Sequence, residues 1–270
     1  MSALIFRLRS VPRQTVDLSS LTPDRLSGKG GKEIAAIELT SGNRKLPAGE
    51  LFEISGSDAT NIVFRDACDK LSRIGQGMTG GSITVDGDAG AYLGLGMRNG
   101  SIKVRGNVGA WTGSGMADGE IRVQGNAGEF LGAAIAGDKQ GMLGGAIIVE
   151  GNVGARAGDH MRRGMLLIRG NVGDYCGSRM LAGTIAVLGA TGDGLGFGLK
   201  RGTLLLSQTP TPSATFNDCG THDLAFLHLL HAQFRHMCGA QTEFAPHTAR
   251  VRRFMGDLAN GGKGELLVYI

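Results

Sequence analysis

Glycine and apolar positions recur along the middle of the chain with a fixed period. The glycines that open each unit follow one another at intervals of 19, 19, 26, 19 and 19 residues, namely Gly87, Gly106, Gly125, Gly151, Gly170 and Gly189. Each unit reads G-N-x-G-x-x-x-G-x-x-M-x-x-G-x-[IL]-x-[VI]-x, and the longer interval contains a seven-residue insertion at 134–140. A fixed period of this length indicates stacked structural repeats.

Each unit contains one short alternating apolar pair, such as Ile102 and Val104, and this pattern predicts a single strand. Nineteen residues are too few for the two helices of a tetratricopeptide or ankyrin repeat, and the leucine-rich pattern is missing. The six-residue period of a left-handed β-helix is missing as well. The spacing therefore predicts a mainly β fold, a parallel β-helix with one strand per coil. Its inward columns are expected to contain the strand residues and two further sets, Ala89/Val108/Ala127/Val153/Val172 and Met97/Met116/Met142/Met161/Met180.

Departures from the period predict three parts, at 1–50, 51–207 and 208–270. The first is expected to be an N-terminal cap with short strands at 3–8 and 34–40. A degenerate coil follows, with a strand at 51–56 and about twelve inserted residues within 58–70. In the last part, apolar spacing predicts a helix over 222–238 that starts near Asn217 and Asp218. We expect this helix to cap the open end of the stack and a final strand to occupy 265–270.

Two outward columns are conspicuous. Strand alternation predicts that one column faces solvent and changes from basic to apolar along the stack, through Lys103, Arg122, Ile148, Leu167, Ala186 and Leu205. The apolar part, Ile148, Leu167, Ala186 and Leu205, is a candidate interface with a partner, and cover by the C-terminal helix is the alternative. A second column contains Tyr92, Trp111, Phe130, Arg156 and Tyr175, which we interpret as a ladder stacked in the core.

Composition and charge limit the classes of function that this chain can have. The chain has 47 glycines in 270 residues without a collagen triplet, so glycine is expected to serve turns of the repeat. The net charge is +4 and no dense basic stripe with interleaved aromatics is present, which argues against nucleic acid. No signal peptide and no apolar run of membrane-spanning length is recognised. The four cysteines form no C-x-x-C pair, so a reduced, cytoplasmic protein is expected.

Five basic residues share the corner that follows the methionine column: Arg98, Arg162, Arg163, Lys200 and Arg201. Cations aligned in this way can hold a polyanion, and a solvated, solubilising face is the alternative reading. No convincing catalytic group accompanies them. The set formed by His222, His228, His231, His236, Cys219 and Cys238 lacks the spacing of known metal motifs, and the glycine run at 192–198 is not followed by Gly-Lys-Ser/Thr. We therefore expect no catalytic residue and no metal site in this chain.

The coils resemble those of a known family. The triplets Gly106/Gly109/Gly113 and Gly170/Gly173/Gly177 are similar to the C-terminal domain of the glutamate synthase large subunit and to the C-type subunit of formylmethanofuran dehydrogenase. The Met-x-x-Gly-Gly corner, the insertion with its flank at 137–145, and the segment 73–79 favour the C-type subunit, with a resemblance over about residues 45–207. The C-terminal segment with His222–Leu227 resembles the bacterial version, the formyltransferase/hydrolase complex of methylotrophs.

This resemblance implies a right-handed coil and a non-catalytic subunit in a cytoplasmic complex of four subunit types. An amidohydrolase-like subunit and a formyltransferase subunit would carry a formyl group from tetrahydromethanopterin through a methanofuran-type carrier to formate. The carrier and any metal would then reside on partner subunits. The polyglutamate tail of the carrier is a candidate ligand for the five corner cations. Alternatives are the C-type subunit of an archaeal formylmethanofuran dehydrogenase, a glutamate-synthase-type spacer, and a free-standing β-helix enzyme, which would need outward carboxylates or histidines grouped on adjacent coils.

Overall fold

A computed structural model describes residues 2–270. The chain is mainly β, as predicted, with one 13-stranded sheet, one four-stranded sheet and few helices. The elements of the N-terminal region are β1 (Ala3–Leu8), β2 (Val16–Asp17), α1 (Pro23–Leu26), α2 (Gly31–Ala35), β3 (Glu38–Ser41), β4 (Arg44–Pro47), α3 (Ala48–Leu51) and β5 (Phe52–Ser55).

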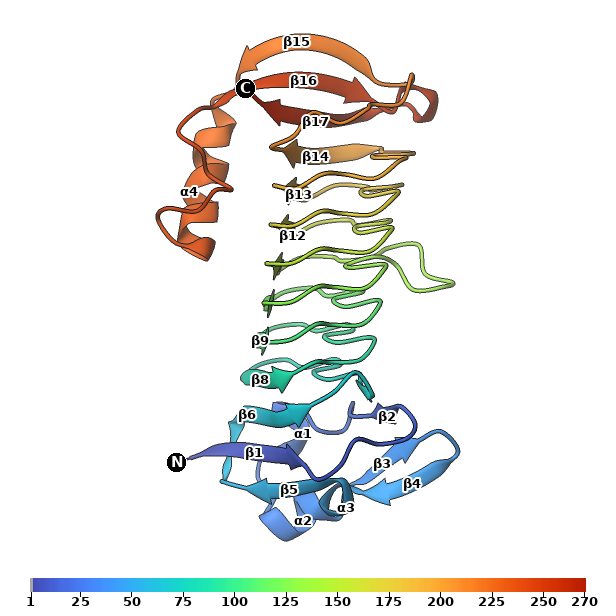
Figure 1. The fold of residues 1–270 in the computed structure, drawn as a ribbon, viewed down its shortest axis with the longest axis vertical. Coiled ribbons are helices and arrows are strands. Elements are labelled where there is room, and N and C mark those ends of the chain that lie inside the picture. Colours follow the sequence, from blue (N-terminus) through green and yellow to red (C-terminus); the bar gives the residue numbers. More distant parts are fainter. Residues whose placement is uncertain (1) are drawn as a thin grey trace.

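The remaining elements form the long axis of the molecule and its C-terminal end (Figure 1), except for the short strand β7, which pairs with β2. They are β6 (Asp58–Ala67), β7 (Leu71–Ser72), β8 (Ser82–Gly87), β9 (Ser101–Val104), β10 (Glu120–Val123), β11 (Ala146–Val149), β12 (Met165–Ile168), β13 (Thr184–Val187), β14 (Arg201–Leu206), β15 (Asn217–Asp223), α4 (Phe226–Cys238), β16 (Arg250–Gly256), the short 3₁₀ helix η1 (Leu258–Asn260) and β17 (Lys263–Tyr269).

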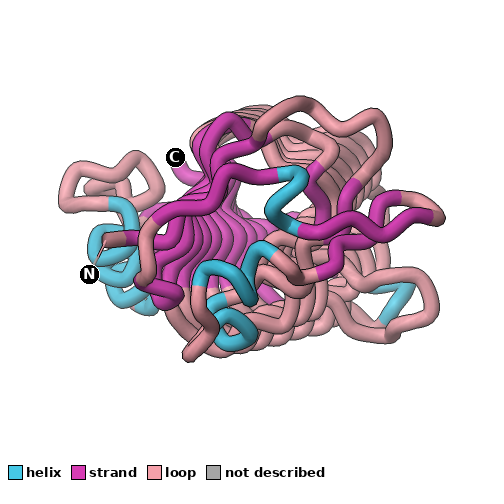
Figure 2. Tube along the Cα trace, turned by 90° about the horizontal axis from the view of Figure 1, so that it is seen from below, coloured by secondary structure: helices cyan, strands magenta, loops and turns pink. Residues whose placement is uncertain are grey.

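Strands β6 and β8 to β14 pair in parallel, in chain order, and each coil returns the chain to the start of the next strand. The register follows the sequence period, so that Ile121 lies opposite Ile102 on one side and Ile147 on the other. A second line of parallel bridges joins the coils from Ala89 to Thr191. Viewed along the stack, the strands superimpose along one side and the loops along the rest (Figure 2).

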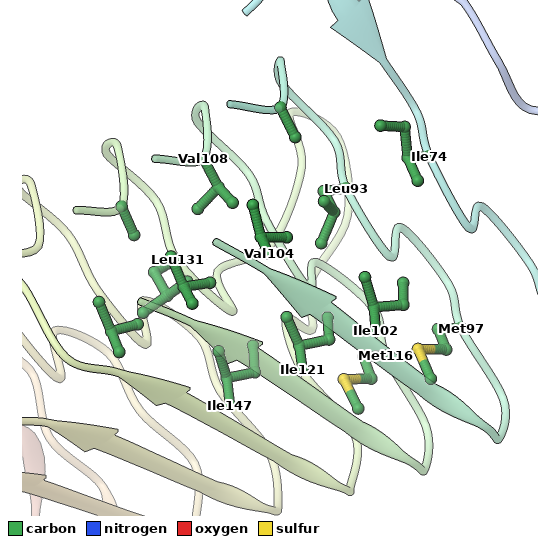
Figure 3. Close-up of a cluster of buried hydrophobic side chains, with 14 of the residues drawn as sticks. Ile74, Leu93, Met97, Ile102, Val104, Val108, Met116, Ile121, Leu131 and Ile147 are labelled. Atoms are coloured by element: carbon green, nitrogen blue, oxygen red, sulfur yellow. The ribbon is translucent and has the colours of Figure 1, made fainter. Parts of the chain in front are cut away.

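Equivalent residues of successive coils pack on one another inside the stack (Figure 3). The five methionines of the repeat are completely buried, and the strand residues Ile102, Ile121 and Ile147 are at most 1% exposed. Glycine is required where the coils approach most closely. A Cβ on Gly125, for example, would lie 2.6 Å from the carbonyl oxygen of Gly106. The inward columns expected from the sequence are therefore confirmed.

Asparagine side chains add a ladder along one corner of the stack. The side-chain oxygens of Asn107, Asn126, Asn152 and Asn171 each accept a hydrogen bond of 2.8 Å from the backbone N–H of the equivalent residue one coil further along the chain. Asp88 begins the ladder by accepting from the backbone N–H of Asn107 at 2.7 Å. The repeated asparagine thus replaces a backbone acceptor where the chain turns.

The N-terminal region differs from the expectation in two places. Residues 34 and 35 belong to α2, so the strand expected over 34–40 is shortened to β3. The polar stretch at 58–70 is not an insertion, because it contains β6, whose Ile62 and Phe64 pair with Ile83 and Val85 of β8 and are buried. The strand expected at 51–56 is present as β5, but it pairs antiparallel with β1 rather than with the stack.

The C-terminal region also departs from the expectation. Asn217 and Asp218 lie in β15 instead of starting a helix, because β15 pairs antiparallel with β16. The end of the stack is extended by β17, which is parallel to β14 and close to the expected strand, and then by β16 and β15. Helix α4 does not lie over this end; it lies beside the strands (Figure 1).

The asparagine ladder predicts that Asn126→Ala and Asn126→Asp differ in stability. Alanine leaves the backbone N–H of Asn152 without its acceptor, which is expected to lower the free energy of unfolding by about 1 kcal/mol. Aspartate offers the same acceptor geometry, as Asp88 does in the first position. The free energy of unfolding of Asn126→Asp should therefore stay within about 0.5 kcal/mol of the wild-type value. Urea unfolding measures both variants, and equal losses would contradict the proposed role of the side-chain oxygen.

Candidate functional site

The apolar outward column is covered by the chain itself. Ile148, Leu167, Ala186 and Leu205 are each at most 2% exposed. They form a second core with Leu227 and Phe234 of α4, Phe244 and Ala245 of the following loop, Val251 and Leu267. These four side chains are therefore not an exposed docking surface in this structure. Helix α4 and the loop after it cover them, which was the alternative expectation, and we call these two segments the cover. The change from Lys103 and Arg122 to apolar residues coincides with the edge of the cover.

Polar contacts fix the margin of this cover. Arg122 donates to the backbone oxygen of Met237 at 2.6 Å, and Arg169 contacts both Glu150 and Glu243. Within the cover, a nitrogen of the buried His231 ring hydrogen bonds the hydroxyl of Tyr269. Burial, together with Arg235 and His228, lowers the pKa of His231, while burial raises the pKa of Tyr269. The second core is thus a packed layer with a neutral polar pair inside it.

The five corner cations all lie on the surface, spread along one edge of the stack. Arg98 and Arg162 are three coils apart, about 14 Å, and Arg162 and Lys200 are two coils apart, about 10 Å. Ala117, Leu143 and Leu181 occupy the same position in the intervening coils. Among residues 2–270, none of the five cations forms an ion pair. Their charges are available to a ligand, but the fold does not gather them into one pocket.

The aromatic column lies at the surface rather than in the core. Tyr92, Trp111 and Phe130 are half-buried and their rings stack with centroid distances of 5.4 and 4.8 Å. The guanidinium groups of Arg73 and Arg156 lie over Tyr92 and Tyr175 at 4.9 and 4.8 Å. All of these residues have φ between 56° and 63°, a conformation that costs a bulky side chain about 1–2 kcal/mol. Stacking between coils offsets part of this cost.

A buried carboxylate, that of Asp159, lies in the first coil after the insertion. Asp159 is 4% exposed and accepts hydrogen bonds from Ser178 Oγ at 2.8 Å and from Arg179 Nε at 2.9 Å. His160 Nδ1 lies 3.3 Å from the same carboxylate. Because the carboxylate is paired with a guanidinium and a hydroxyl, it is satisfied, as burial of a charge requires. This cluster was missed from the sequence, since its members lie one coil apart and share no motif.

The histidines and cysteines of the C-terminal region are dispersed. Within residues 2–270, no group of three or more His, Cys, Asp or Glu side chains is arranged to hold a metal ion. His222 instead contacts the backbone oxygen of Cys219 at 2.9 Å, and His231 contacts Tyr269. Over the same residues no helix has the length and apolar character needed to cross a membrane. Among the described residues, these histidines and cysteines therefore make local contacts and are not brought together at one place.

Comparison with known proteins identifies a matching family and a close structural relative. The model of the GXGXG motif family matches residues 74–219. A chain in the X-ray crystal structure of the formyltransferase/hydrolase complex (FhcABCD) from Methylorubrum extorquens in complex with methylofuran has a TM-score of 0.92 and 40% sequence identity to this chain. That match covers 98% of this chain and 99% of the other.

Curated relatives match over a shorter region. The C-type subunit of the formyltransferase/hydrolase complex Fhc from M. extorquens is 41% identical over 87 residues, which are 32% of this chain and 33% of the relative. The C-type subunit of tungsten-containing formylmethanofuran dehydrogenase 2 from Methanococcus maripaludis is 35% identical over 95 residues, which are 34% of this chain and 35% of the relative. The chain therefore matches about a third of the length of these relatives.

The cover over the outward column predicts the effect of Phe234→Ala. Phe234 is fully buried between the stack and Phe244, so truncation should weaken the attachment of α4 by about 3–5 kcal/mol. Faster amide exchange in α4 and increased binding of a hydrophobic dye would report exposure of the column. Leu229→Ala, at a residue 78% exposed on the same helix, is the control and should change neither signal. Equal exchange in the two variants would show that the Phe234 side chain does not hold α4 against the column.

Proposed function

This chain belongs to the GXGXG motif family, and from that premise we propose that it is the C-type subunit of a formyltransferase/hydrolase complex. The observation that carries the proposal is the likeness to a chain of the M. extorquens complex, which extends over nearly the whole of both chains at 40% identity. The curated C-type subunit of the same kind of complex supports it over about a third of its length.

In this role the chain is a scaffold and supplies no catalytic residue. Its repeated columns are used for packing, and its buried Asp159 carboxylate is paired with Ser178 and Arg179 of the next coil. We infer a right-handed parallel β-helix at 51–207, closed at its two ends by the regions 1–50 and 208–270. The in-register parallel strands and the second line of bridges support this architecture.

The reaction belongs to the proposed partners. An amidohydrolase-like subunit and a formyltransferase subunit would move a formyl group from formyl-tetrahydromethanopterin to a methanofuran-type carrier and release it as formate, in cytoplasmic one-carbon oxidation. A fourth subunit completes the proposed assembly. The solved relative was crystallised with methylofuran, which supports a carrier of this class. The carrier and metal are assigned to the partners, and this chain positions those partners relative to one another.

A second candidate is the C-type subunit of an archaeal formylmethanofuran dehydrogenase. The tungsten-containing enzyme of M. maripaludis includes a relative with 35% identity over 95 residues, and this similarity favours that candidate. The two proposals differ in the partners they require, since a dehydrogenase adds redox-active metal to the assembly. The metal content of the purified complex therefore separates them.

The five corner cations are proposed to attract the polyglutamate tail of the carrier. Their exposure and lack of internal ion pairs support this role. Their spacing of about 10–14 Å favours an extended polyanion that passes along the edge over a compact anion. Such an attraction between solvent-exposed charges would be weak at each site and sensitive to salt.

Native mass spectrometry of the protein purified from its host tests the scaffold assignment. We expect the chain in an assembly with three further subunit types, and the assembly should release formate from the formylated pterin. The isolated chain should show no such activity, because it contributes no catalytic group. A chain that purifies without partners under gentle conditions would overturn the assignment.

Charge reversal tests the role of the corner cations. Replacing Arg162, Arg163 and Lys200 together by glutamate should weaken binding of the polyglutamate carrier to the complex and flatten the dependence of its affinity on salt. Lys29→Glu with Lys32→Glu changes exposed charges of the N-terminal region and should leave the affinity unaltered. Unchanged affinity and salt dependence in the triple variant would exclude this contact.

A further inference from the structure

The insertion after the fourth coil strand covers a cavity on the preceding coils. In Figure 1 the insertion is the light-green loop that projects from the stack. Its ends are fixed to the following coil, since the backbone N–H groups of Ala134 and Gly141 donate to the oxygens of Asp159 and His160 at 3.1 and 2.9 Å. The loop between them borders a cavity of about 460 Å³, a volume within the range of small-molecule sites.

The floor of this cavity contains polar groups that the fold leaves without partners. Ser114 is fully buried, and its hydroxyl makes no hydrogen bond within the described chain. The only serine at the equivalent position of another coil, Ser178, instead donates to Asp159. Buried hydroxyl groups are normally satisfied, so an isolated one at a cavity floor points to a missing partner.

The neighbouring backbone donor is also free. Along this corner, the N–H groups of Gly77, Gly96, His160 and Arg179 each donate to a carbonyl oxygen of the next coil at 2.7–3.0 Å. Gly115 holds the same position, yet its N–H makes no hydrogen bond among residues 2–270. The insertion follows in the next coil, where the chain leaves the regular path. Two consecutive residues thus present unpaired polar groups at the same place.

Open space adjoins the two glycines at this corner. A Cβ built on Gly96 would meet no atom within 4 Å, and one on Gly115 would meet only the Cα of Gly96 at 4.0 Å. A ligand can therefore approach the backbone closely. The walls contribute Leu95, Ile135 and Leu143, and the loop adds two residues of opposite charge, Lys139 and Asp138.

We propose that this cavity binds a carboxylate group with a short apolar chain. The Ser114 hydroxyl and the Gly115 N–H would each donate to the carboxylate, and Lys139 would supply the charge that stabilises it. The apolar walls contact the chain behind the carboxylate. A free short-chain acid and an acidic side chain of a polypeptide share this chemistry. Asp138 opposes the ligand charge and limits the affinity.

Titration of the full-length chain with butyrate, followed by the amide resonances, tests the proposal. We expect a saturable downfield shift of the Gly115 amide proton with millimolar affinity, and no such shift with butyramide, which lacks the charge. A second titration with N-acetylglutamate amide separates the two sources: tighter binding of it identifies an acidic side chain, and tighter binding of butyrate identifies a free acid. Failure of both ligands to shift Gly115 saturably would overturn the proposal.

Variants distinguish a binding role from a structural one. Ser114→Ala should weaken butyrate about tenfold while the thermal midpoint stays the same or rises, because an unsatisfied hydroxyl is removed. Ser178→Ala should do the opposite, lowering the midpoint and leaving affinity unchanged. Lys139→Gln should weaken binding and Asp138→Asn should strengthen it, each severalfold. Wild-type affinity in Ser114→Ala or Lys139→Gln would contradict the assigned contacts.

Discussion

The structure depends on hydrogen bonding between successive coils in register. Nearly every turn outside the strands donates an N–H to the coil before it or after it, so each coil satisfies its neighbour's backbone rather than its own. This arrangement holds only if the coils keep the same length and the same path. The 19-residue period, the glycines at close approaches and the left-handed residues at the corner are all consequences of that requirement.

The same requirement forces side chains into columns. A residue at a given position meets its own equivalents one coil away, which permits buried methionines to pack together and half-exposed aromatic rings to stack. It also makes departures from the pattern informative. Asp159 is tolerated inside the wall because Ser178 and Arg179 of the next coil satisfy it, whereas Ser114 has no such neighbour among residues 2–270.

Periodicity made the central coils predictable from the sequence, and loss of periodicity marks where the predictions failed. Strands β9 to β14 and the methionine column follow from residues that repeat every 19 positions or after the insertion. Strand β6 was missed because its apolar residues Ile62 and Phe64 lie 21 positions before their partners, within a polar stretch. The place of α4 was not encoded in any local pattern. It depends on apolar residues of β11 to β14 that only the folded sheet brings together. The surface position of Trp111 and its neighbours was equally hidden, because a period does not tell which way a left-handed residue directs its side chain.

The parallel stack has a further consequence for anything attached to its two ends. Eight strands at the usual spacing extend about 34 Å, and that length is set by the number of coils alone. Adding or removing one 19-residue unit would shift one end by about 4.8 Å without disturbing the local structure of any other coil. The number of coils therefore sets the distance between the two ends of the stack, and the seven-residue insertion lies at a fixed distance from each end.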